Sequence, residues 1–125
     1  MKIVVEVDLA KCMHVKLEQE KAIELINALI RSHGIVRDLE EAKRVVENFD
    51  EYYNIARRRF ESYIVIPKDV TDSLRGRALI HKLRLIVEDG KKLVEIVFDK
   101  RVREEFIIEI LKRLGYEVEV KHATL

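Results

Sequence analysis

The dipeptide Asp89-Gly90 is the sequence feature that most constrains how this chain can fold. It separates two runs rich in Leu, Ile and Val within residues 82–98. Asp-Gly is typical of a two-residue type I′ turn, because both central residues need a positive φ and the twist of the turn matches that of the strands. The stretch therefore predicts an antiparallel β-hairpin that reverses at these two residues.

The charges of the two runs predict the register of this hairpin. With residues 89–90 as the loop, Arg84 faces Glu95 and Glu88 faces Lys91, so opposite charges lie across from each other. Side chains alternate between the two faces of a strand, and the other face is then almost entirely apolar. That face carries Leu83, Leu85, Val87, Val94, Ile96 and Phe98. A slip of one residue would turn charged side chains toward the core, so we expect this register to hold.

Length and composition are typical of one intracellular domain. The chain has 125 residues, enough to bury a core without cross-links, and its single cysteine, Cys12, has no partner for an internal disulfide. We find no secretory signal and no apolar run of membrane-spanning length, and we expect a soluble cytoplasmic protein. Charged residues make up 38% of the chain with a net charge of only +1, a composition that resembles thermophile proteins.

Apolar periodicity predicts the other helices and strands. In chain order these are a strand at 2–8, helices at 17–33 and 38–60, a strand at 62–67, a helix at 100–114 and a final strand at 116–122. Residues 9–16 fit a loop or an early helical turn, and residues 68–81 fit a short helix. Asp38 with Glu41 predicts a capping box at the start of the second helix.

The order β-α-α-β-(α)-β-β-α-β predicts one α+β domain that spans residues 1–125. We expect a mixed sheet of about five strands, packed with a helical hairpin and a C-terminal helix. The strand–helix–strand unit at residues 91–122 should be parallel. The plan resembles the ferredoxin-like, split β-α-β architecture with an extra strand and helix, a resemblance that implies no function.

The predicted helix 38–60 carries a regular heptad seam. Its apolar residues follow one another at alternating steps of three and four: Leu39, Ala42, Val46, Phe49, Tyr53, Ala56 and Phe60. Such a seam can pack on the preceding helix, on the sheet or on a second copy of the chain. It therefore supports a protein-interaction or homodimerisation module as an alternative function.

One basic segment stands out against the balanced charge of the chain. Residues 55–84 hold eight basic and three acidic side chains. The basic ones are Arg57, Arg58, Arg59, Lys68, Arg75, Arg77, Lys82 and Arg84. Arginine and lysine neutralise phosphates, and the aromatic residues between them can stack on bases. We therefore predict a non-enzymatic domain that binds DNA or RNA. The plainer alternative is that the three arginines stabilise the negative end of the helix dipole and that the aromatic residues belong to the core.

Catalytic and metal-binding motifs are missing from the sequence. We find no cysteine or histidine spacing for zinc, no glycine-rich phosphate loop and no nucleophile with a base, so we expect no metal, cofactor or catalytic residue. A further alternative is a metal-dependent nuclease. Glu119 and Lys121 resemble the Glu-x-Lys half of the restriction-endonuclease-like pattern, with Asp99 as the candidate partner. That hypothesis requires the three side chains to cluster.

Overall fold

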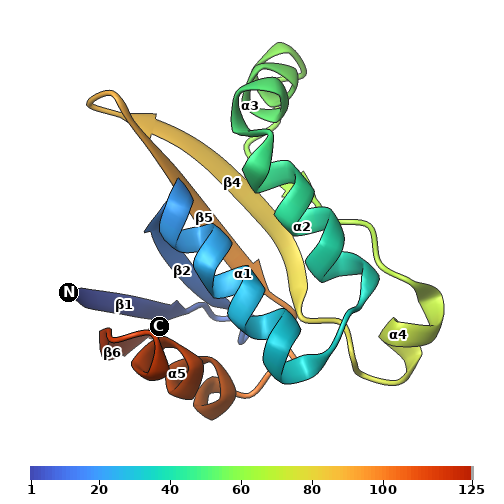
Figure 1. Cartoon of the computed structure of the whole chain (residues 1–125), viewed down its shortest axis with the longest axis vertical. Coiled ribbons are helices and arrows are strands. Elements are labelled where there is room, and N and C mark those ends of the chain that lie inside the picture. Colours follow the sequence, from blue (N-terminus) through green and yellow to red (C-terminus); the bar gives the residue numbers. More distant parts are fainter. Residues whose placement is uncertain (125) are drawn as a thin grey trace.

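A six-stranded sheet in the order β3-β4-β5-β2-β1-β6 forms the frame of the molecule (Figure 1). A computed structural model describes residues 1–124. The strands are β1 (Lys2–Val7), β2 (Met13–Glu18), β3 (Ile64–Val65), β4 (Ile80–Glu88), β5 (Lys91–Phe98) and β6 (Glu117–His122). Neighbouring strands are antiparallel except β1 and β6, which are parallel. The predicted α+β class is confirmed.

The predicted hairpin is confirmed in its turn and its register. Asp89 and Gly90 have φ values of 51° and 75°, as a type I′ turn requires. Arg84 lies opposite Glu95, and its Nη2 atom donates to Glu95 Oε2 over 2.8 Å. Glu88 lies opposite Lys91, as predicted, but its ion pair is with Lys16 of β2.

Strand β2 brings the sheet to six strands, and it is the element that the sequence prediction missed. It covers part of the stretch assigned to a loop or helical turn, and it takes the first residues of the helix expected at 17–33. That helix, α1 (Gln19–His33), begins two residues later than predicted. Met13, Val15 and Leu17 are buried and alternate with His14 and two exposed residues. This period of two went unrecognised because Leu17 also fits the apolar stripe of the helix.

The single helix expected at 38–60 is wrong, because the chain bends at Asn48. The structure has α2 (Arg37–Glu47) and α3 (Phe49–Arg58) instead. Asn48 lies at φ −104° and ψ 44°, outside helical values, and its side-chain amide donates to the Arg44 carbonyl. The first four seam residues, Leu39 to Phe49, are buried in the core of the same chain. Only Tyr53, Ala56 and Phe60 retain exposed surface.

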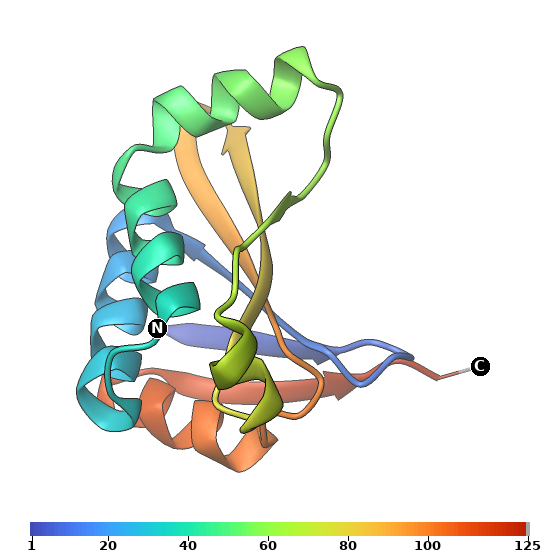
Figure 2. The same cartoon turned by 90° about the vertical axis from the view of Figure 1, so that its right-hand side faces the viewer.

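Helices α1, α2 and α5 (Glu104–Arg113) lie on one face of the sheet, where the apolar core sits (Figure 1). Helix α3 turns away from the line of α2 and crosses the top of β4 and β5 (Figure 2). The short helix α4 (Val70–Leu74) lies at the other end of the molecule. None of these helices, within residues 1–124, combines the length and apolarity needed to cross a bilayer.

The carboxylate of Asp38 holds α2 against the start of β4 instead of forming the predicted capping box. The N-terminal cap of α2 is Val36, and the Asp38 side chain is fully buried. Its Oδ2 atom accepts hydrogen bonds from the backbone N–H groups of Leu79 and Ile80 over 2.8 and 2.7 Å. The capping-box prediction is wrong because this long-range pairing uses the same carboxylate.

Strands β5 and β6 run in the same direction, as expected for the unit that contains α5. Two strands, β2 and β1, lie between them in the sheet. The resemblance to the ferredoxin-like, split β-α-β plan with an extra strand and helix stays a prediction.

Candidate nucleic-acid interface

The eight predicted basic residues fall into separate groups along the molecule. Arg57 and Arg58 form the last turn of α3 and Arg59 is its C-terminal cap, at the top of Figure 1. Arg75 and Arg77 follow α4, at the opposite end. Lys82 and Arg84 lie on β4 between the two, and Lys68 precedes α4. The structure therefore spreads the basic residues from one end of the molecule to the other instead of gathering them in one cluster.

Several of these basic side chains are occupied by contacts inside the protein. Lys68 pairs with Asp99 over 3.4 Å, and Arg84 pairs with Glu95. Arg77 donates to the last carbonyl of α1, at His33, over 3.5 Å. The ammonium of Lys82 lies over the Tyr63 ring, 4.2 Å from its centroid. A phosphate would have to compete with these existing contacts for each cation. The four residues are therefore weaker candidates for ligand contacts.

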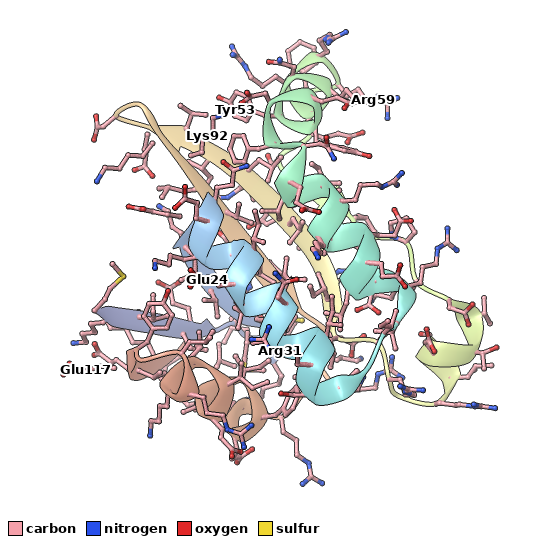
Figure 3. All side chains as sticks on the ribbon, viewed as in Figure 1. Glu24, Arg31, Tyr53, Arg59, Lys92 and Glu117 are labelled. Atoms are coloured by element: carbon pink, nitrogen blue, oxygen red, sulfur yellow. The ribbon has the colours of Figure 1, made fainter. Side chains whose placement is uncertain are left out.

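Residues 57–60 form what we call the arginine tip, the exposed end of α3. In residues 1–124, none of its three arginines makes an ion pair with a carboxylate. The Arg57 guanidinium instead lies over the Tyr53 ring, 5.7 Å from the centroid. Figure 3 shows Tyr53 on the side of α3 that faces the β4–β5 hairpin and Arg59 on the outer side. The tip therefore presents uncompensated positive charge to solvent.

Phe60 ends helix α3 in an unusual way. Its N–H donates to the Arg57 carbonyl over 3.2 Å, and the Glu61 N–H donates to the Ala56 carbonyl over 2.9 Å. This pair of bonds is a Schellman motif, in which the residue at the Phe60 position adopts the left-handed conformation and is usually glycine. Phe60 has φ 55°, and its side chain is 96% exposed. The fold thus holds a strained aromatic residue in water beside three arginines.

The buried carboxylate of Glu95 lies on the sheet face that points away from the core helices. It anchors Tyr63, in the loop that follows the tip. Glu95 is 8% exposed and accepts hydrogen bonds from Arg84, from the Tyr63 hydroxyl at 3.0 Å and from His14 Nδ1 at 3.2 Å. Burial alone would raise the pKa of Glu95, but the bonds from His14 and Tyr63 and the charge of Arg84 hold that pKa below its usual range. With its oxygens occupied, Glu95 is a structural anchor for Tyr63 and not a free base.

A hollow of about 250 Å³ lies beside this network at the end of β1 and β6. Its lining includes side chains of both charges and is formed by Glu6, Val7, Asp8, His14, Lys121, His122 and Ala123. His14 Nε2 lies 2.7 Å from Asp8 Oδ2, so its ring is held between two carboxylates and donates to both only when protonated. The sequence prediction missed this cluster, because its members become neighbours only through the pairing of β2 with β1 and β5.

The three residues of the nuclease hypothesis lie apart in the sheet. Asp99 follows β5, whereas Glu119 and Lys121 lie on β6, with two strands between. Glu119 pairs with Lys2 over 2.6 Å, and Asp99 pairs with Lys68 and Arg101. Within residues 1–124, no group of three His, Cys, Asp or Glu side chains is placed to share a metal ion. The structure therefore does not bring the proposed metal-binding carboxylates together.

No family model, curated protein or solved structure matches this chain. What the arginine tip can bind follows from its chemistry. Guanidinium groups bond phosphate oxygens in a bidentate manner and stack on planar rings, and an exposed phenyl ring offers a further stacking surface.

Proposed function

We propose that this protein is a non-enzymatic domain that binds nucleic acid through its basic segment, with the arginine tip as the main contact. The observation that carries the proposal is the exposure of Arg57, Arg58 and Arg59 without an ion pair in residues 1–124. Such cations displace the counterions condensed on nucleic-acid phosphates, and the release of these counterions drives binding without sequence preference.

Charge reversal tests the proposal. The variant Arg57→Glu, Arg58→Glu should weaken binding to a labelled oligonucleotide at low salt. The slope of log affinity against log salt should also become shallower by about 1.4, since each of the two lost phosphate contacts to a single strand contributes about 0.7. Fluorescence anisotropy across a salt series measures both quantities.

The matched control is Lys112→Glu, Arg113→Glu in α5. These two residues occupy the same positions before the C-terminal cap of their helix, so the helix dipole is opposed to the same degree in both variants. We expect the control to bind as the unmodified protein does. Equal losses in both variants would mean that only net charge matters, and unchanged binding in the α3 variant would contradict the proposal.

A second candidate function is self-association through what remains of the heptad seam. Tyr53 and Ala56 are half-buried, and Phe60 is exposed at the end of the seam. A partner that covered these three residues would bury apolar surface that the fold itself leaves in water. Light scattering at rising concentration separates the two candidates, and a monomer throughout the series would contradict self-association.

A further inference from the structure

The Phe60 ring has no evident role in the stability of the fold. Its position in the Schellman motif favours glycine, because a side chain at positive φ is strained. Its exposure of 96% means that burial does not offset this strain. Among residues 49–60 it is the one large apolar side chain that is fully in solvent. A ligand that covers the ring would remove this exposed apolar surface.

We infer that Phe60 stacks on an unpaired base and that the ligand of the arginine tip is therefore single-stranded nucleic acid. The inference rests on the proposed function. Arg57, Arg58 and Arg59 directly precede the ring in the chain. The arginines can therefore bind phosphates of the same strand whose base stacks on the ring. Bases inside a duplex hide their faces in the stack, whereas an unpaired base offers its face to an aromatic side chain.

The chemistry of the tip favours a nucleic acid over an anionic membrane. Membrane binding by an exposed segment grows with the apolar area it inserts, and the tip offers a single ring. Insertion of the ring would also carry the exposed carboxylate of Glu61, which follows it directly, toward the apolar layer, and burying that charge is costly. All three cations are arginines, whose planar guanidinium matches both phosphate and base.

Two substitutions distinguish the effect of the Phe60 ring on binding from its effect on the fold. Phe60→Gly removes the ring and suits the left-handed backbone, so the end of α3 should stay intact. Phe60→Trp keeps an aromatic face, and because the chain has no other tryptophan, it supplies a single fluorescent reporter at the contact. Leu74→Ala is the control, since Leu74 is another exposed apolar residue, 82% exposed, on α4 at the far end of the molecule.

The probes are a labelled oligodeoxythymidylate, an oligouridylate, and the deoxy strand annealed to its complement. Phe60→Gly should weaken binding to both single strands by about tenfold, as expected for one lost stacking contact, and should leave the salt dependence unchanged. Duplex binding should be weaker than single-strand binding and insensitive to the substitution. The tryptophan of Phe60→Trp should be quenched by the single strands, and Leu74→Ala should bind as the unmodified protein does.

The outcomes distinguish this inference from the function on which it rests. If charge reversal at Arg57 and Arg58 weakens binding but Phe60→Gly does not, the stacking inference is overturned and the proposed function stands. If no probe binds at low salt, both are overturned. If phosphatidylserine vesicles shift the tryptophan emission to the blue and the oligonucleotides leave it unchanged, the tip is a membrane contact and the inference is again overturned.

Discussion

Helices α3 and α5 end in the same backbone hydrogen-bond pattern but with opposite chemistry. In α5 the Gly115 N–H donates to the Lys112 carbonyl over 3.0 Å, and the Tyr116 N–H donates to the Leu111 carbonyl over 3.1 Å. The equivalent stretch of α3 runs from Ala56 to Glu61, with its two bonds at 3.2 and 2.9 Å. Both helices therefore stop through a Schellman motif, and only the side chains differ.

The side chains show what each helix end serves. At the end of α5, glycine takes the left-handed position at φ 96°, and Tyr116 is buried in the same core cluster as Leu111. At the end of α3, phenylalanine takes that position, and the next residue, Glu61, is exposed. The first arrangement stabilises the fold, whereas the second gives up stability and displays a ring next to arginines. Such local conflict between sequence and backbone is typical of functional sites.

The largest expected difference lies two residues after each C-terminal cap, at Tyr116 in α5 and at Glu61 in α3. Tyr116→Ala should lower the free energy of unfolding by about 3 kcal/mol, because it removes a large buried side chain. Glu61→Ala should change it by less than about 0.5 kcal/mol, as expected for an exposed position. Urea unfolding followed by circular dichroism measures both. Similar losses in the two variants would show that the end of α3 is packed and not displayed.

A second contrast is between two aspartates, Asp99 in the turn that leads into α5 and the exposed Asp50 on α3. Asp99 accepts hydrogen bonds from the backbone and side chain of Arg101. Burial alone would raise the pKa of Asp99, but these bonds and the charges of Arg101 and Lys68 lower it from 3.8 to about 2. A folded-state pKa below the unfolded value adds stability that is present above 3.8 and is lost as the pH falls through about 2.

Asp99→Asn should therefore lower the free energy of unfolding at neutral pH by about 2 kcal/mol, the linkage equivalent of that shift. The gap between the variant and the unmodified protein should close as the pH falls from 4 to about 2. Chemical denaturation at several pH values measures it. Asp50→Asn is a suitable control, since Asp50, on α3, pairs with Lys92 at an exposed site. A gap that persists at low pH would show that Asp99 acts by packing and not by charge.

Local sequence rules predicted much of the sheet and part of the site. The turn at 89–90 and the pairing of Arg84 with Glu95 follow from patterns within a few residues, and both are confirmed. The strand β2 was missed because its alternation is short and merges with a helical stripe. Asp38 was misassigned because its partners lie about forty residues further along the chain.

The candidate site divides in the same way. The three arginines are visible in the sequence, and charge counting finds them. The exposure of Phe60 could not be predicted, because Phe60 continues a regular seam and that seam predicts burial. The bend at Asn48 turns α3 across the sheet, and with it the end of the seam leaves the core. No pattern of apolar spacing records such a change of direction.

The smallest expected effect addresses the left-handed position itself, and its sign is opposite at the two helix ends. Gly115→Ala should lower the free energy of unfolding by about 1 kcal/mol, because an L-side chain is strained at positive φ. Phe60→Gly should raise it by about the same amount, since it removes such strain and exposes no new apolar surface.

Thermal denaturation of both variants measures these shifts, with Phe60→Ala as the control that removes the ring but keeps a Cβ at φ 55°. We expect Phe60→Ala to leave stability nearly unchanged, so that the gain in Phe60→Gly is assigned to the backbone. A loss of stability in both Phe60 variants would mean that the ring makes a stabilising contact. In that case α3 would resemble α5, and its end would be a structural cap and not a displayed ligand contact.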